Sequence, residues 1–488
     1  MDDAALAKYL EDQAARQVAE NRSRACPRPV LRGDPLPGPA APDMVAVVES
    51  TPEFQVCLNT PDNDSFTKFY DRFLVERDKP GGGLPERRLR YVSTAVFHEI
   101  TSDMKTACIP WVARLRKATR HEDACSPYRF GVRDFHVVRQ YKNSRHGLGK
   151  VLAVAASEWE TGDRRETMGL MLDVLRFFQD MRRGGVTWIQ AMISTDMGIF
   201  PTVSVMEWML NQPSLVGQDL LASVSKELDL LSASQPSFSS SLRADLRHMA
   251  SAWEFDENIL RDEASTKTFD GMDVRQWPWP PAWGPAPVSE RRRLRPLRPV
   301  IAAGDARTDL GLTRVFDDVT DAYGAACRES DTALRCRERI AAYQKRLGPM
   351  ENGFAKQALK AFFAPFRGKS TGSALQEWTA KYVSHTYAIS MDGFSSSWGQ
   401  SSFALFALRL LVDYRLLAER TGMCPDPDAL TRAAGREHLT DPCSGQEIVI
   451  RKISATRLFI EPPRVPGCET DNQERPILVA ECPFAKSE

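Results

Sequence analysis

The chain has 488 residues, of which 42% are hydrophobic and 26% are charged, a composition typical of folded globular proteins and not of disordered ones. Its 64 Lys and Arg residues balance its 64 Asp and Glu residues, so no net charge attracts it to nucleic acid or to an anionic membrane. No stretch reaches the roughly 20 consecutive apolar residues that a membrane-spanning helix needs.

The first 43 residues predict a polar helix followed by a proline-rich strap. Residues 1–24 are charged and helix-forming, and they contain no apolar signal core. Residues 26–43 hold six prolines, which exclude a regular helix. Either the protein is cytoplasmic, or the chain as numbered begins after a leader that has been removed. We favour the second interpretation.

Residues 44–270 predict a helical domain. Apolar residues recur there at spacings of three and four, as on the buried face of a helix. Asp163 is a predicted N-cap, Gly184-Gly185 a predicted helix end, and Pro201 a predicted break. Successive helices with short Gly or Pro joints predict a mainly α fold, as a multi-helix bundle or an irregular helical array.

Residues 271–300 interrupt the helices and predict a linker or strap. Seven prolines exclude a helix, and three tryptophans precede the only concentrated run of arginines. Such a segment could bind an acidic protein partner, nucleic acid or an anionic surface, or could simply pack on the helical body. We expect a protein partner and no nucleic acid, and the candidate partner-binding residues are Trp277, Trp279, Trp283, Arg291, Arg292, Arg293 and Arg295.

A second helical region is expected over residues 301–400, and residues 401–488 predict a long helix followed by a β-hairpin. The alternation of Ile448 and Ile450 with Glu447 and Arg451 is the period-two pattern of a half-exposed strand. The run at 477–480 predicts a further strand. The small C-terminal unit is therefore a helix plus a hairpin.

The ten cysteines predict disulfide bonds, because their number is even and they cluster in local couples. The sequential pairing is one guess among the many that ten cysteines allow, and buried free thiols are the alternative. A Cys327–Cys336 bond would require a corner between two helices at 328–331. The sequential couples are Cys26/Cys57, Cys108/Cys125, Cys327/Cys336, Cys424/Cys443 and Cys468/Cys482.

The C-terminal segment carries one resemblance. A helix at 405–420, a Pro/Asp loop at 425–428 and the motif Asp441-Pro442-Cys443-Ser444-Gly445 before a hairpin resemble a cassette of uncharacterised bacterial envelope proteins. The helix-then-sheet order is also loosely similar to that of type II secretion pseudopilins. In those proteins the hydrophobic helix is an N-terminal anchor, whereas here it is internal and carries Arg409. The resemblance implies an envelope setting and no catalytic residues.

Candidate catalytic residues are few. Asp134, His136 and His146 could orient one another for acid–base chemistry, but no partnering nucleophile is identifiable, and polar contacts at a helix end are the favoured interpretation. The serine-rich segment 393–402 predicts a turn and helix cap rather than a nucleophile. Phosphate-binding glycine loops and Cys-x-x-Cys pairs are missing from the sequence.

Two histidine patterns bear on metal binding. His98-Glu99 begins like a zinc-protease helix motif, but Ser102 occupies the place of the second histidine. His121, in a polar segment just before Cys125, could belong to a surface metal patch, although a polar loop beside a disulfide is favoured. We expect neither a metal nor another cofactor.

The sequence thus predicts a non-catalytic binding or scaffolding protein of a bacterial envelope or secreted assembly, periplasmic or extracellular. The first alternative is a helical hydrolase-type enzyme that uses the Asp/His cluster. The second is a protein that binds nucleic acid or an anionic surface through the arginines of 291–298.

Overall fold

The computed structural model divides the chain into two compact units. One consists of residues 1–19, 242–331 and 335–393, and the other of residues 20–241, 332–334 and 394–488. Each unit is described by itself. The described residues are 26–48, 51–60, 95–126, 135–184, 191, 194–212, 216–239, 241–242, 319, 321–323, 325–328, 332–347, 395, 398–465, 468 and 478–484.

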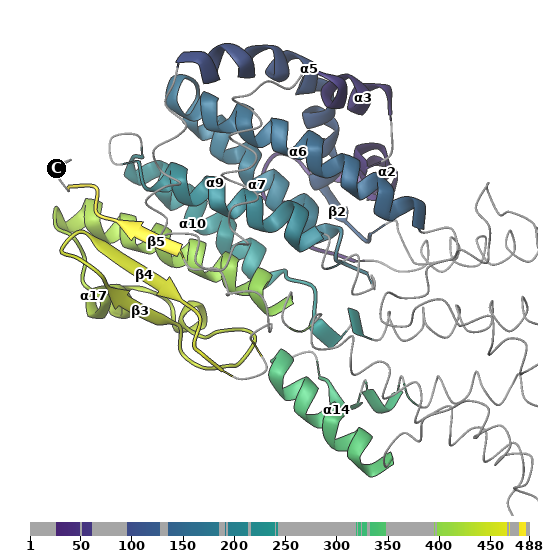
Figure 1. Ribbon diagram of the computed structural model, residues 1–488, viewed down its shortest axis with the longest axis vertical. Helices are drawn as coiled ribbons and strands as arrows, with labels where there is room; N and C mark the ends of the chain where they lie inside the picture. Colours follow the sequence, from purple (N-terminus) through teal and green to yellow (C-terminus); the bar gives the residue numbers. More distant parts are fainter. Residues whose placement is uncertain are drawn as a thin grey trace, which may run out of the picture. The chain divides into compact units, whose positions relative to one another are not determined.

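The larger unit is mainly α, as the sequence predicts, with a small three-stranded sheet near its C-terminal end. In Figure 1 the long helices α5, α6 and α7 follow one another as neighbours, and α10 lies beside α7. None of the described helices is long and apolar enough to span a bilayer. The helices of this unit are α2 (Ala41–Val48), α3 (Pro52–Asn59), α5 (Ala95–Thr119), α6 (Phe135–Thr161), α7 (Arg164–Asp180), the π-helix η5 (Thr195–Ile199), α9 (Phe200–Leu210), α10 (Gln218–Ala233), the helical residues 398–421, α17 (Pro427–Ala433) and the 3₁₀ helix η9 (Arg436–Leu439).

Helix α7 is the centre of this unit. The Asp163 side chain caps its N-terminus by accepting hydrogen bonds from the backbone N–H groups of residues 165 and 166, as predicted. Every residue from Thr167 to Asp180 except Leu170 is buried, so α7 is covered on all sides. Gly198 of η5 lies against the Phe178 ring so closely that a Cβ would fall 2.1 Å from it, which explains the glycine.

One hydrophobic core joins the N-terminal helices to the C-terminal segment. It contains Trp159 of α6, Met171 of α7 and Leu411 of the helix at 398–421, together with Ile460 of the sheet, all essentially buried. The described residues of 398–484 are therefore packed on the same core as α2–α10 and do not depend on a separate one.

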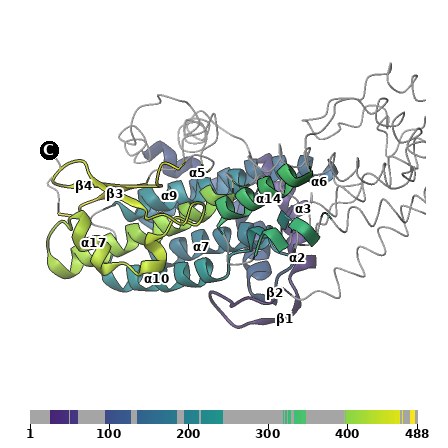
Figure 2. The same ribbon diagram turned by 90° about the horizontal axis from the view of Figure 1, so that it is seen from below.

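The proline-rich strap is held by a short parallel pairing. Strand β1 (Leu36–Pro39) pairs with β2 (His121–Asp123), and the two lie side by side in Figure 2. The Ala40 N–H donates to the Asp123 carbonyl at 2.8 Å. The His121 ring bonds through Nε2 to Asp43 at 2.8 Å and through Nδ1 to the Gly38 carbonyl at 3.0 Å. Both ring nitrogens are thus engaged in the strap.

The predicted hairpin and its additional strand are confirmed. Strands β3 (Val449–Lys452), β4 (Arg457–Glu461) and β5 (Leu478–Glu481) form an antiparallel sheet in that order. The Asp-Pro-Cys-Ser-Gly motif before it forms a tight turn. Asp441 accepts from the Ser444 N–H at 3.0 Å and from its hydroxyl at 2.6 Å, and Gly445 has φ of 72°.

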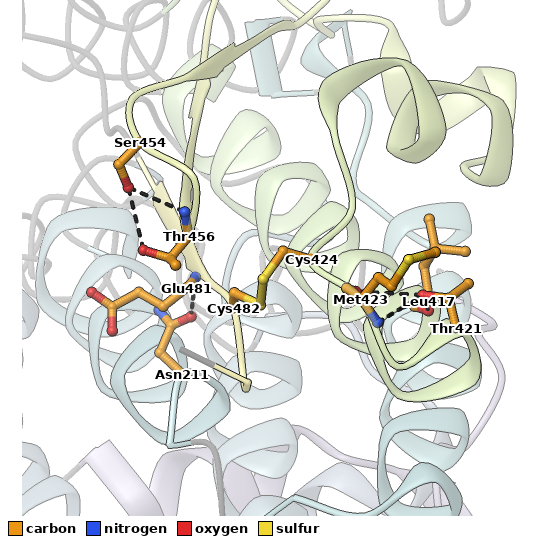
Figure 3. The surroundings of a disulfide bond; sticks show 9 residues. All are labelled: Asn211, Leu417, Thr421, Met423, Cys424, Ser454, Thr456, Glu481 and Cys482. Carbon is orange, nitrogen blue, oxygen red and sulfur yellow. Dashed lines mark hydrogen bonds between the residues drawn. A yellow bond between two sulfur atoms is a disulfide. The ribbon is translucent and has the colours of Figure 1, made fainter. Parts of the chain in front are cut away.

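The outer edge of β5 is covered by two side chains of α9, one helical turn apart. Glu207 accepts a hydrogen bond from the Val479 N–H at 2.7 Å. Asn211, the C-cap of α9, donates to the Val479 carbonyl at 2.8 Å. It also accepts from the Glu481 N–H at 2.9 Å, as Figure 3 shows. These contacts take the place of a neighbouring strand, so this edge is closed to other chains.

All ten cysteines form disulfides, as predicted, but the sequential pairing is wrong except for Cys327–Cys336. The other bonds are nested, one loop inside another, because packing on the helices brings distant cysteines together. The Cys424–Cys482 bond, for example, ties the loop after the 398–421 helix to the residue that follows β5 (Figure 3). The nested pairs are Cys26–Cys125 around Cys57–Cys108, and Cys424–Cys482 around Cys443–Cys468.

In the smaller unit the described residues centre on the Cys327–Cys336 bond. Helical residues end at 326, and α14 (Ala333–Leu347) begins beyond the predicted corner. Tyr323 packs edge-to-face on Tyr343, with ring centroids 5.8 Å apart, and Gln344 donates to the Tyr323 hydroxyl at 3.1 Å. The disulfide thus joins two helices that already contact each other.

Candidate functional site: a buried arginine cluster

The most unusual chemistry of the larger unit lies at the C-terminal end of α7. The residues Arg176, Asp180, Arg182 and Arg183, together with Arg28 of the strap, are here named the arginine cluster. Only Arg183 is more than marginally accessible, and its side chain is 12% exposed. Groups of this kind are almost never buried unless they are paired.

Gly184 follows the cluster directly in the sequence. This glycine has φ of 84°, and a Cβ on it would lie 3.0 Å from the sulfur of Cys26. Glycine adopts this positive φ without strain, and it has no Cβ to crowd the sulfur. The disulfide Cys26–Cys125 therefore lies directly behind the arginine cluster and fixes the strap that carries Arg28.

Arg28 and Asp180 form a bidentate pair. The Arg28 Nε lies 3.2 and 3.1 Å from the two carboxylate oxygens, and its Nη2 donates at 2.6 Å. Both side chains are essentially inaccessible to solvent. Arg183 also contacts Asp180, with Nε 3.4 Å from the carboxylate. A single aspartate thus pairs with two arginines.

Arg176 links α7 to the end of α10. Its Nη1 donates to the Ser234 hydroxyl at 2.8 Å and to the Gln179 amide oxygen at 3.2 Å. Gln179 in turn donates to the Leu231 carbonyl at 2.7 Å, and Arg183 donates to the Ser234 carbonyl. The ends of the two helices are therefore joined by polar side chains as well as by the hydrophobic core.

Arg182 links α7 to the 398–421 helix. Its Nη1 donates to the Ser401 hydroxyl at 2.7 Å, and that hydroxyl donates to the Trp398 carbonyl at 2.8 Å. The neighbouring Ser402 hydroxyl donates to the Gln235 amide oxygen at 2.6 Å. Residues 234 and 235 at the end of α10, and 401 and 402 of the 398–421 helix, thus supply the polar partners on this side of the cluster.

The cluster has more donors than acceptors. Among the described residues, Nε and Nη2 of both Arg176 and Arg182 have no hydrogen-bond partner, nor do Nη1 of Arg28 and the Gln235 amide nitrogen. Four arginines face one aspartate. The C-terminal dipole of α7, equivalent to about half a negative charge, offsets part of this excess.

The electrostatics of the two arginines follow from their burial. Burial lowers the pKa of Arg182 to about 10, and the positive charge of Arg183 acts in the same direction. Burial also lowers the pKa of Arg176 to about 10, against the attraction of Asp180. Both guanidinium groups are therefore still protonated at neutral pH and remain strong donors.

A second charged group lies on the same face of α7, nearer its N-terminus. Arg32 of the strap pairs with Asp173 at 2.7 Å and with Glu227 of α10 at 3.1 Å. Burial raises the pKa of both carboxyls, while Arg32 acts to lower it. These contacts hold the strap on α7 and α10.

The sequence-predicted cluster of catalytic candidates falls largely outside the described side chains. Asp134 lies outside the described residues, while His136 and His146 are both in α6. Ten residues of helix separate their α-carbons by about 15 Å along the axis. The serines of 393–402 take part in the arginine cluster instead, through Ser401 and Ser402.

The candidate metal sites contain no free ligand set among the described residues. His121 is engaged by Asp43 and Gly38, as described above. Cys26, Asp123 and Cys125 present ligand atoms within 4.8 Å of one another, but the two sulfurs are bonded to each other. Asp123 also accepts from the Cys26 N–H at 2.7 Å. The group is therefore a disulfide bond with a hydrogen bond from the Cys26 backbone to Asp123 beside it.

The predicted partner-binding segment, with Trp277, Trp279, Trp283, Arg291, Arg292, Arg293 and Arg295, lies outside the described residues. The arginine cluster was not predicted from the sequence, because charged residues at three and four spacing in α7 are typical of a solvated helix face. Comparison with protein-family models, curated proteins and solved structures finds no match to the chain.

Proposed function

We propose that this chain is a non-catalytic binding or scaffolding protein of a bacterial envelope or secreted assembly, and that the arginine cluster is its binding site. The observation that carries the proposal is the set of five disulfides that uses every cysteine. Disulfides persist in oxidising compartments and are rare in the cytosol.

The positions of the disulfides support a rigid scaffold. Cys26–Cys125 holds the strap that presents Arg28, and Cys424–Cys482 holds the end of the sheet. The arginine cluster lies where α7, α10 and the 398–421 helix meet, and its donors are fixed by hydrogen bonds to serines. Preorganised donors of this kind suit binding.

The test is a thiol count on protein taken directly from its native host. Cells are quenched in acid, the protein is denatured without reductant, and free thiols are labelled with a maleimide that adds a fixed mass. The proposal predicts no label without reductant and ten labels after reduction. Ten labels without reductant would place the cysteines in a reducing compartment and overturn the proposal.

A further inference from the structure

In two arginines of the cluster, Arg176 and Arg182, the Nε–H and Nη2–H groups have no partner among the described residues. The Nε–H and Nη2–H groups of a guanidinium are parallel and match two oxygens of one carboxylate or phosphate group. Arg28 uses this edge to hold both oxygens of Asp180. Arg176 and Arg182 are anchored through Nη1 instead, and the same edge has no partner among the described residues.

Arg182 is the clearer of the two. The residue is 2% exposed, and no carboxylate in the described part of the chain pairs with it. An isolated charge removed from water costs several kcal/mol unless it is paired. Ser401 satisfies one nitrogen but supplies no negative charge, so these residues alone do not neutralise the group.

The surroundings favour a ligand that only accepts hydrogen bonds. The Gln235 amide, whose oxygen accepts from Ser402, has a nitrogen that is also unpartnered among the described residues. Six buried nitrogens of the cluster and of Gln235 thus have no acceptor there, namely Nε and Nη2 of both Arg176 and Arg182, Nη1 of Arg28 and the Gln235 amide nitrogen. An anionic ligand supplies both an acceptor and a negative charge, whereas water or a cation would not remove the excess of positive charge.

We infer that the arginine cluster binds a tetrahedral oxyanion, namely phosphate or the phosphate group of a larger molecule, on the Nε/Nη2 edge of Arg182. A phosphate group carries up to two negative charges and a carboxylate carries one, so phosphate offsets more of the cluster's excess of positive charge. The inference rests on the proposed function only in that it names a ligand for its binding site.

The first experiment uses the full chain with its disulfides intact. Purified protein is denatured, and the released anions are quantified by ion chromatography, which detects an anion that exchanges too slowly for titration. In parallel, the thermal midpoint is measured with inorganic phosphate, glycerol phosphate, succinate or chloride at matched ionic strength. We expect either stoichiometric released phosphate or sulfate, or a saturable rise of a few degrees with phosphate or glycerol phosphate beyond that with chloride.

The two phosphate probes distinguish the sources of the ligand. A larger rise with glycerol phosphate indicates an organic phosphate, and an equal rise indicates free phosphate. Arg182→Met is expected to abolish the response and Arg182→Lys to weaken it at least ~10-fold in affinity, since lysine lacks the two-pronged edge. Arg165→Met, an exposed arginine at the start of α7, is the matched control and should respond like the wild type.

Ser401→Ala keeps the arginine but removes its anchor, and it replaces Arg182→Met if that variant does not fold. It should weaken the response. A response to succinate alone would contradict the inference. So would the absence of both released anion and phosphate stabilisation, or an undiminished response in the Arg182 variants. Free cysteine thiols in protein taken from the host would overturn the proposed function. The anion release and the phosphate response of the variants would be unaffected.

Discussion

Replacing Asn211 with alanine should detach the edge of β5 from α9. The side chain of Asn211 is the shared partner of two backbone groups, the Val479 carbonyl and the Glu481 N–H. Asn211 is 5% exposed, and Val479 is 4% exposed. Alanine fits the helical backbone at this C-cap position, so the substitution removes the two hydrogen bonds without straining the chain.

The magnitude follows from the two groups that lose their partner. A buried backbone donor or acceptor left without a hydrogen bond costs about 1–3 kcal/mol. Two such groups at a sheet edge, with some access to water after the substitution, predict a loss of about 2–4 kcal/mol. The Glu207 contact to the Val479 N–H remains, so β5 should loosen without leaving the sheet entirely.

The assay is hydrogen–deuterium exchange of a peptide covering residues 478–484, together with urea unfolding. A local loss of about 2 kcal/mol or more predicts exchange at least ~30-fold faster. Thr421→Ala, which removes an exposed hydroxyl bonded to the Leu417 carbonyl at 2.8 Å, is the control and should change stability by less than about 0.5 kcal/mol. Equal exchange in both variants would refute the idea that α9 serves as the missing strand.

Two further perturbations test the strap and the nested disulfides. Arg32→Gln should lower the free energy of unfolding by about 2 kcal/mol near pH 7, because it removes the ion-pair partner of Glu227 and leaves Asp173 only the longer contact with Arg116 at 3.5 Å. Burial raises the pKa of both carboxyls, so they protonate early as the pH falls, and urea unfolding at pH 4 should show a smaller deficit. A deficit that grows in acid would contradict this assignment. Replacing Cys57 and Cys108 together by serine opens a cross-link between cysteines 51 residues apart and should cost about 4 kcal/mol in the chain-entropy estimate, measured by urea unfolding. Unchanged stability would show that this bond does not constrain the chain.

The sequence predicts local features of this fold well. The cap at Asp163 is observed, and α7 ends at Asp180, with Gly184 closing the turn that follows. The break predicted at Pro201 is not, because the chain stays helical from 194 to 210 and only widens into a π-helical turn before the proline. The alternation at Ile448 and Ile450 likewise predicts the hairpin, although the first strand itself begins at Val449, two residues into the alternating pattern.

The nested pairing of the disulfides was not predictable, because it depends on which distant segments pack together. Cys26 meets Cys125 only after the strap has paired with β2. The contact of Asn211 with β5 joins residues 270 positions apart and leaves no periodic pattern in the sequence.

The arginine cluster was missed for a related reason. In α7 and the turn after it, the charges at Asp173, Arg176, Asp180 and Arg183 follow the spacing of a solvated helix face. The tertiary structure buries that face under the strap and α10. Burial is what converts an ordinary charged stripe into a candidate site, and burial is decided by segments far away in the chain.

The most direct test of the proposed scaffold is to map the disulfide linkages of protein isolated from its native host. Non-reduced peptides are separated and identified by mass spectrometry. We expect Cys26 linked to Cys125 and Cys57 linked to Cys108, with Cys424 linked to Cys482 at the C-terminal end. Free thiols at these positions would contradict both the scaffold and the compartment that we propose, whereas sequential couples in place of the nested ones would contradict the scaffold.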